Sequence, residues 1–221
     1  MANHVYFNLQ VEGVNDEQFE SVISTETRKM KSWDDSEYEY QEFKELHEQP
    51  FMSHCKVEYD EDGYLKDSWN WYCNNVGAKW CNVDDFGGCM LTGYSAWSAP
   101  TEMGWNLVYF LSKTFNTRVT AKMTYEDEFR NFIGVNEWET EFNYPEHDDE
   151  EGDWDVYYDE NYLDGEVITD ACREYFGEAF DDDDFEWWDE IENDAGDKVI
   201  PQEVVDDAVY NFFETGEFKI N

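Results

Sequence analysis

The segment from Trp69 to Pro100 constrains the fold most, because it combines helix signals, a turn signal and a concentration of large aromatic side chains. Ser68 is a favourable N-cap for a helix that runs to about Val76, and Gly77 fits the left-handed position that commonly follows a helix. Aromatic side chains of this size dominate the energetics of protein cores. The segment therefore predicts a packed α+β scaffold.

Two strands and a second helix are predicted after Gly77. Residues 80–86 and 89–97 fit strands on either side of Gly87–Gly88, a dipeptide that marks a turn. Pro100 suits the first position of a helix that runs to about Phe115. Apolar residues spaced three, three and four apart predict the inner side of this helix, and they are Trp105, Val108, Leu111 and Phe115.

The flanking segments supply further pieces of a sheet. Residues 4–11 alternate apolar and polar side chains, as a strand does, and Asn15 with Gln18 fits the capping box of a short helix. Residues 118–125 alternate in the same way, and residues 129–135 fit one more strand. The predicted order is strand, helix, insertion, helix, two strands, helix and two strands.

The predicted insertion covers about residues 24–68. Its segment 36–46 fits a helix with an inner side formed by Tyr40, Phe43 and Leu46. Asp62–Gly63 marks a tight turn. This turn is favoured over an EF-hand calcium loop, because the loop position that requires a glutamate would be occupied by Trp69.

Two motifs in this region resemble a known family. Asn70–Trp80 reads NWYCNNVGAKW and Ser95–Pro100 reads SAWSAP. They resemble the YubB-type ferredoxin-like domain family of phages and plasmids, which has a W-C-x-x-N-W-G-T-K-W run and then an A-W-S-P-P run that opens a helix. The resemblance covers about residues 3–136, and the sequence departs from the family at Val76, Ala78 and Ala99. It implies a ferredoxin-like antiparallel sheet with helices on one face and a phage or plasmid origin, but no particular activity.

The net charge of the chain is extreme. It has 55 acidic and 14 basic residues, which gives a formal net charge of −41. Residues 137–221 hold 32 acidic and 3 basic residues, whereas residues 1–136 hold 23 and 11. Self-repulsion on this scale opposes compaction, although an aromatic content of 19% provides for a substantial core. The uneven excess predicts that the C-terminal part carries a charged working surface.

We therefore predict two domains: a ferredoxin-like domain over residues 1–136 and an acidic, aromatic-anchored, mainly helical extension over residues 137–221. Within the extension, residues 137–152 are predicted as an exposed connection. The elements predicted after it are a strand at 154–158, a helix capped by Thr169 that contains Phe176 and Phe180, a short helix capped by Asp181–Asp184 with Phe185, Trp188 and Ile191 on one side, and a last helix from Pro201 to Gly216.

The predicted partner-binding residues are acids in two groups. Duplex DNA presents one charge per about 1.7 Å of its axis, and a helix rises about 1.5 Å per residue. Acids two to four residues apart on ordered elements can therefore approximate a phosphate array. The first group is Asp181, Asp182, Asp183, Asp184, Glu186, Asp189 and Glu190, and the second group is Asp148, Asp149, Glu150 and Glu151.

The sequence gives no motif for catalysis or a cofactor. It has no Walker, Rossmann, G-x-S-x-G or HExxH pattern, and its four histidines lie in no metal-ligand spacing. Acid pairs are too abundant to indicate a glycosidase. The five cysteines form no C-x-x-C pair, so they are predicted as free thiols and not as a zinc site. We expect no enzyme activity, no cofactor and no specific metal.

The charge also restricts the partners and the location. Direct binding to nucleic acid or to an anionic membrane is disfavoured, whereas a basic protein surface is favoured. The N-terminus lacks the basic start and apolar run of a signal peptide, and no stretch has the length of a membrane span. We expect a soluble protein of the host cytoplasm, either a monomer or a homodimer.

The charge and the resemblance leave two non-enzymatic functions open. The first is a phage-encoded DNA mimic that inhibits a host DNA-binding or defence complex, of the nuclease, restriction or CRISPR type, by occupying its basic DNA groove. The second is an accessory binding or assembly protein that engages a basic phage or host protein without imitating DNA. The two differ in whether DNA competes for the partner.

Overall fold

The computed structural model describes residues 3–32, 36–144, 152–180, 185–193 and 195–220. The chain divides into two compact units. The first unit contains Met1–Tyr125 and Asn136–Asp159, and the second unit contains Glu126–Val135 and Glu160–Asn221. The predicted domain boundary at residue 136 falls inside a strand.

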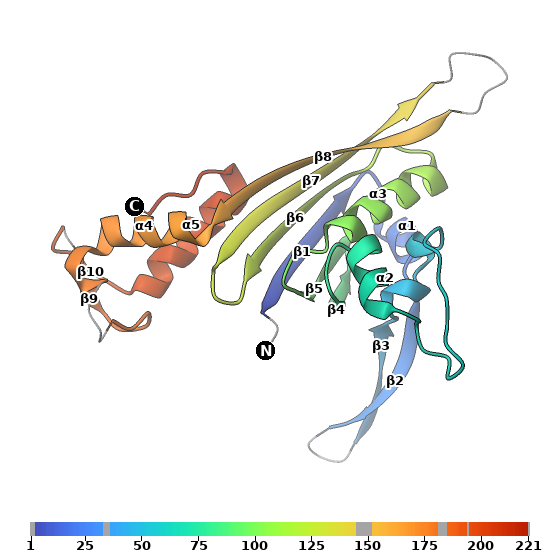
Figure 1. Cartoon of the computed structure of the whole chain (residues 1–221), viewed down its shortest axis with the longest axis horizontal. Coiled ribbons are helices and arrows are strands. Elements are labelled where there is room, and N and C mark those ends of the chain that lie inside the picture. Colours follow the sequence, from blue (N-terminus) through green and yellow to red (C-terminus); the bar gives the residue numbers. More distant parts are fainter. Residues whose placement is uncertain (1–2, 33–35, 145–151, 181–184, 194, 221) are drawn as a thin grey trace. The chain divides into compact units, whose positions relative to one another are not determined.

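The described part of the fold contains β-strands, α-helices and three short 3-10 helices, which are named η1 to η3 (Figure 1). In chain order the elements are β1 (His4–Glu12), α1 (Asp16–Glu20), β2 (Thr25–Lys31), β3 (Glu37–Phe43), η1 (Leu46–Glu48), η2 (Pro50–Met52), α2 (Ser68–Asn75), β4 (Cys81–Gly87), β5 (Met90–Ala96), α3 (Thr101–Phe115), β6 (Thr120–Asp127), β7 (Phe132–Asn143), β8 (Asp153–Asp164), α4 (Gly165–Phe176), η3 (Gly177–Ala179), β9 (Ile191–Glu192), β10 (Lys198–Val199) and α5 (Pro201–Thr215).

A large antiparallel sheet is the main feature, with the strand order β4-β5-β1-β6-β7-β8. β1 pairs with β5 from His4 opposite Ala96 to Gln10 opposite Met90, and β4 pairs with the other side of β5. The arrows of β6, β7 and β8 alternate in direction in Figure 1. The strands predicted at 4–11, 80–86, 89–97 and 118–125 are confirmed as β1, β4, β5 and β6.

The sheet is buried on one face and exposed on the other. In β1, Val5, Phe7, Leu9 and Val11 are at most 4% exposed, whereas the side chains between them are exposed, namely Tyr6, Asn8, Gln10 and Glu12. This period of two follows from the pleat of a strand. We call the exposed side the open face; it contains these four side chains and those that share their side of the neighbouring strands.

Helix α3 covers the buried face. Met103, Leu107 and Leu111 are fully buried along its inner side. Ser112 and Thr140 of β7 share a hydrogen bond of 2.7 Å, and Thr140 also accepts a bond from the backbone N–H of Val119 at 2.8 Å. The predicted helix is confirmed over Thr101–Phe115, although Pro100 is its N-cap and not its first residue. The helix is closed by Asn116 in the left-handed conformation.

The insertion differs from its prediction. Residues 37–43 form strand β3, so the predicted helix over 36–46 is wrong. β3 pairs with β2 in a separate two-stranded sheet. Tyr38 and Tyr40 are exposed, whereas Phe43 and Leu46 turn inward where the hairpin joins the unit. The buried Gln49 side chain fixes this base through bonds of 2.8–3.0 Å to the backbone of Ser24 and Lys44.

The predicted exposed connection over 137–152 is wrong for its described N-terminal part, because β7 continues to Asn143. Trp138 and Thr140 are buried while Glu137, Glu139 and Glu141 are exposed, which is a strand pattern. The strand predicted at 154–158 is confirmed and extends over Asp153–Asp164 as β8.

The second unit has its own apolar core. Its buried residues come from β7, α4 and α5 and are Ile133, Val135, Ile168, Cys172, Phe176, Val205, Val209 and Phe212. The last helix begins at Pro201 as predicted and ends at Gly216, whose φ is +77°. Thr169 is not the cap of α4: Asp164 is the N-cap and accepts a bond from the backbone N–H of Glu166 at 2.9 Å.

The contact between α3 and β7 depends on the absence of a side chain at Gly104. A Cβ atom added there would lie 2.7 Å from two ring carbons of Trp138, which is 2% exposed. We expect Gly104→Ala to destabilise the protein by about 1–3 kcal/mol, since overpacking a core forces rings and backbone to shift. The midpoint of urea unfolding measures this, and Thr114→Ala on the exposed side of α3 is the control. An unchanged midpoint would contradict the tight contact.

Candidate functional site

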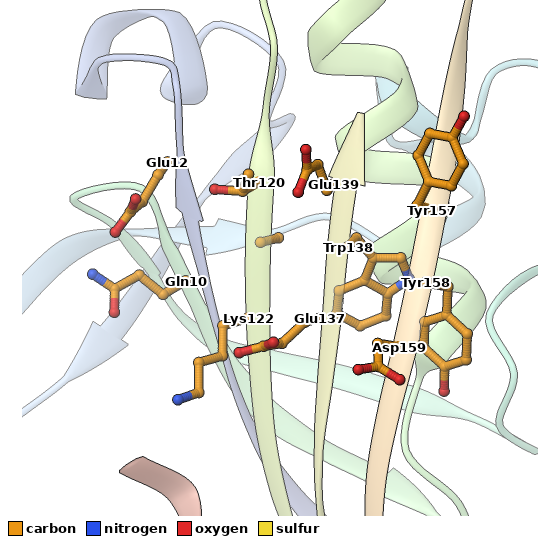
Figure 2. A pocket seen from close by; sticks show the side chains of 11 residues that line it. Gln10, Glu12, Thr120, Lys122, Glu137, Trp138, Glu139, Tyr157, Tyr158 and Asp159 are labelled. Atoms are coloured by element: carbon orange, nitrogen blue, oxygen red, sulfur yellow. The ribbon is translucent and has the colours of Figure 1, made fainter. Parts of the chain in front are cut away.

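A pocket on the open face brings together polar side chains from four neighbouring strands. Figure 2 shows Gln10 and Glu12 of β1, Thr120 and Lys122 of β6, Glu137 and Glu139 of β7, and Tyr157 and Asp159 of β8 at this site. All of them belong to the first unit. Ala121, Trp138 and Tyr158 complete the lining. The pocket is therefore rich in carboxylates.

The carboxylates of β7 face outward because their neighbours are needed in the core. Trp138 packs on Gly104 and Thr140 bonds to Ser112, so Glu137, Glu139 and Glu141 take the opposite side. Residues two apart on a strand are separated by about 6.6–6.8 Å. Three carboxylates thus form a row along β7.

Strand β8 adds acids beside this row, at the edge of the sheet. Asp155, Tyr157 and Asp159 are exposed, and Asp155 accepts a hydrogen bond from the side chain of Asn143. The ring of Tyr158 packs against Trp138, with centroids 5.7 Å apart. We call Glu137, Glu139, Glu141, Asp155 and Asp159 the acidic rows.

The first residue of β8 is fastened to α3. Asp153 accepts hydrogen bonds from the Tyr109 hydroxyl at 3.2 Å and from Lys113 Nζ at 3.2 Å. The backbone N–H of Trp154, together with these two side chains, lowers the pKa of the Asp153 carboxyl. These bonds position the strand that carries the outer acids.

Few cations neutralise the acidic rows. Residues 137–159 contain eleven Asp or Glu and neither Lys nor Arg. Arg118 forms an ion pair with Glu139, with both side chains at least half exposed. Of the residues that line the pocket, all of which are described, Lys122 alone is a cation. The local field is therefore negative, which attracts cationic groups of a partner.

The most buried arginine of the second unit forms ion pairs within that unit. The Arg130 side chain is 19% exposed and forms ion pairs with Asp206 and Glu126. Burial raises the pKa of the Glu126 carboxyl, against the opposing effect of Arg130. In the same turn, buried Asp127 accepts bonds from the backbone N–H groups of Phe129 and Asn131. These contacts serve the structure of the β6–β7 turn.

The predicted partner-binding acids are placed only in part. Asp181, Asp182, Asp183, Asp184, Asp148, Asp149, Glu150 and Glu151 lie outside the described residues. Glu186, Asp189 and Glu190 are exposed, and Glu190 pairs with Lys198 at 2.9 Å.

The short helix predicted after Asp184 is wrong for residues 185–190, which form a turn. Trp187, not Trp188, packs inward: its ring centroid lies 5.2 Å from that of Phe185, while Trp188 is 68% exposed. The aromatic contacts of Phe180, Phe185 and Trp187 override the helical spacing.

The acidic rows were missed as a site. Their signal was present in the sequence, since the acids of EWETEF recur at every second position. Such alternation places acids on one side of a strand.

The adjacent side chains of His54 and Cys55 lie close together. Cys55 Sγ lies 3.7 Å from His54 Nε2, and the same nitrogen lies 2.8 Å from Asn106 Oδ1. A base relay needs the two ring nitrogens to contact different partners. Burial also raises the pKa of the Cys55 thiol, whereas an activated cysteine has a lowered pKa. The pair is a packing contact.

Among the residues that the structure describes, no three His, Cys, Asp or Glu side chains converge to form a metal site. Cys73 is exposed, whereas Cys55, Cys81, Cys89 and Cys172 are buried and free. Within the described ranges, no helix combines the length and apolar character needed to cross a membrane.

Comparison with protein-family models, curated proteins and solved structures finds no match to this chain. The resemblance to the YubB-type family therefore stays a prediction, and the geometry and charge of the site are the basis for a proposed function.

Mutual repulsion within the acidic rows should be measurable. We expect Glu137→Gln to raise the thermal midpoint slightly at low ionic strength, through a gain of up to about 0.5 kcal/mol in the free energy of unfolding, because surface changes are of this size. The gain should vanish in about 1 M NaCl, where the Debye length is about 3 Å. Thr124→Val on β6 is an uncharged control. A loss of stability at low salt would show that Glu137 is held by a favourable contact.

The raised pKa of the Glu126 carboxyl fixes the sign of its effect on how stability depends on pH. Its pKa is raised in the native state, so native Glu126 binds a proton more tightly than unfolded Glu126. The stability from this group is present below its unfolded pKa and is lost as pH rises through the raised native pKa. We expect Glu126→Gln to gain stability relative to wild type as pH rises above the unfolded pKa of about 4.3. Urea midpoints of both proteins measure the difference, and a constant or reversed difference would contradict the burial of the charge.

Proposed function

We propose that this protein is a non-enzymatic, phage-encoded inhibitor that binds the basic DNA groove of a host DNA-binding or defence complex in place of DNA. The observation that carries the proposal is the pair of acidic rows. Their five carboxylates, Glu137, Glu139, Glu141, Asp155 and Asp159, stand on paired strands beside few cations.

The density of these charges supports the comparison with DNA. Glu137 to Glu141 spans about 14 Å of strand. Five carboxylates beside such a length correspond to about one per 3 Å, close to the 3.4 Å of axis per phosphate in one DNA strand. Strands also hold the charges in a fixed array, which reduces the entropy lost on binding.

The charge selects the class of partner. A chain with a formal net charge of −41 is repelled by phosphate and by anionic lipid. Lys and Arg side chains that normally hold phosphate can instead pair with the carboxylates. Association would be fast and would weaken steeply with salt, because steering depends on unscreened charge.

We also propose a ferredoxin-like scaffold for the first unit. β1, β4, β5 and β6 are separated by α1, α2 and α3 in the chain order strand, helix, helix, two strands, helix, strand. Their order in the sheet is β4-β5-β1-β6, which is the second, third, first and fourth strand of that set. This order supports the proposal, and β7 with β8 extends the sheet beyond β6.

The acidic C-terminal part is proposed as a second contact surface. Exposed acids of α4 and α5 include Glu174, Glu203, Asp207 and Glu214. Glu186 and Asp189 are also exposed, and the predicted group Asp181–Asp184 stays a sequence-based part of this proposal. Its contribution can be separated from that of the acidic rows by mutation.

The test is capture of partners from a bacterial lysate by the tagged full-length protein, followed by elution with excess duplex DNA. We expect a DNA-binding protein in the DNA eluate. Replacing the five acids of the acidic rows with Gln or Asn should abolish its capture, because the charges that pair with its Lys and Arg are gone. A control variant with the same change in charge neutralises five exposed acids of the proposed second contact surface and should weaken capture without abolishing it; the five are Glu174, Glu178, Glu203, Asp207 and Glu214.

Each outcome assigns a function. A partner that is not eluted by duplex DNA but is eluted by high salt would favour the accessory or assembly role without mimicry. Loss of capture in the control variant alone would move the mimicking surface to the second unit. Absence of any DNA-competed partner would overturn the proposal.

A further inference from the structure

The open face has a second region, made of aromatic rings. Tyr6 of β1 lies directly opposite Tyr94 of β5 in the antiparallel register, so both side chains project from the same face. Their ring centroids are 6.4 Å apart, and Tyr6 is 50% exposed. His4 and Trp80 complete the group, which we call the aromatic platform.

The rings of the aromatic platform support one another. His4 lies 5.3 Å from Tyr94 and 5.5 Å from Trp80, and Trp80 lies 5.6 Å from Tyr94 at an interplanar angle of 86°. Edge contacts of this kind hold each ring in a fixed orientation. The platform is therefore prepared to receive a flat group before any partner arrives.

The aromatic platform and the acidic rows share one face. On β1, the outward positions run from Tyr6 through Asn8 and Gln10 to Glu12, a distance of about 20 Å. Gln10 and Glu12 line the pocket that Glu137, Glu139 and Asp159 also line (Figure 2). An extended peptide segment can therefore reach both regions.

The charge of the face decides which flat group fits. Aromatic side chains on neighbouring strands of an open sheet can stack the bases of single-stranded nucleic acid. Here the same face carries Glu12, Glu137 and Asp159, which repel phosphate. Arginine offers a planar group that stacks on aromatic faces and pairs with carboxylates, and it carries the opposite charge.

We propose that the open face binds an arginine-rich segment of the partner, with guanidinium groups stacked on Tyr6 and Tyr94 and paired with the acidic rows. This inference rests on the proposed function, because it assumes a basic partner. It adds that the surface distinguishes arginine from lysine. Lysine presents a compact, strongly hydrated charge without the planar shape that a stacked pair requires.

The test titrates the full-length protein, by calorimetry at about 150 mM NaCl, with two peptides of equal charge. One alternates glycine with arginine and the other alternates glycine with lysine. We expect the arginine peptide to bind about tenfold more tightly. Tyr6→Leu combined with Tyr94→Leu should remove this preference, whereas Tyr6→Phe combined with Tyr94→Phe should keep it, because phenylalanine retains the aromatic face.

Two controls separate the platform from general charge effects. Tyr64→Leu removes a tyrosine that is 73% exposed outside the sheet and should leave both affinities unchanged. Glu137→Gln combined with Glu139→Gln should weaken both peptides. Thermal midpoints of all variants show that they are folded, and the phenylalanine variant keeps the test valid if the leucine variant is not.

Several results would overturn the inference. Equal affinity for the two peptides, or an arginine preference that survives in the leucine variant, would exclude stacking on the platform. Binding of a thymidine oligonucleotide that the leucine variant loses would assign the platform to nucleobases. If neither peptide binds while DNA still elutes a captured partner, this inference fails and the proposed function stands. If no DNA-competed partner exists, the proposed function fails as well.

Discussion

The packing of α3 against one face of the sheet is the contact on which the rest of the first unit depends. It buries Leu9, Met123 and Trp138 from three different strands. Because side chains alternate across a strand, each buried residue fixes its neighbours on the opposite face. Glu137 and Glu139 are held outward by the burial of Trp138 between them. The core therefore sets the positions of the charges.

This arrangement lets the chain tolerate its own repulsion. A net charge of −41 works against compaction, and apolar burial in each unit offsets it. Many of the cations are used in local contacts: Arg28 and Lys29 pair across the β2–β3 hairpin, and Arg130 is held by Glu126 and Asp206. In the acidic rows, Arg118 pairs with Glu139 at the surface, where both side chains are at least half exposed. The remaining field is directed outward, where a basic partner would meet it.

The two regions of the open face make complementary demands on that partner. The acidic rows attract positive charge of any kind, which gives fast association and strong salt dependence. The aromatic platform favours planar groups, because Tyr6 and Tyr94 present flat rings on which such groups can stack. Charge attraction without a shape requirement would recruit many basic proteins. A face that combines both can select one class of them.

The sequence by itself determined the elements whose signals are local. Gly77 and Gly216 mark helix ends, Pro201 opens α5, and the alternation in residues 4–11 defines β1. It also identified the acid excess and the antiparallel α+β class. The short-range patterns were sufficient because caps, turns and strand pleats depend on a few neighbouring residues.

Only the tertiary structure decided the remaining features. Tyr40 and Phe43 had helical spacing, yet pairing with β2 made their segment a strand, since backbone pairing overrides weak propensity. The sequence predicted an exposed acidic connection over residues 137–143. The packing of Trp138 against Gly104 instead makes this segment part of strand β7. The candidate site combines residues far apart in the chain, such as Tyr6 with Tyr94 and Glu12 with Glu137. Their proximity follows from strand order and register, which long-range packing fixes and local sequence does not encode.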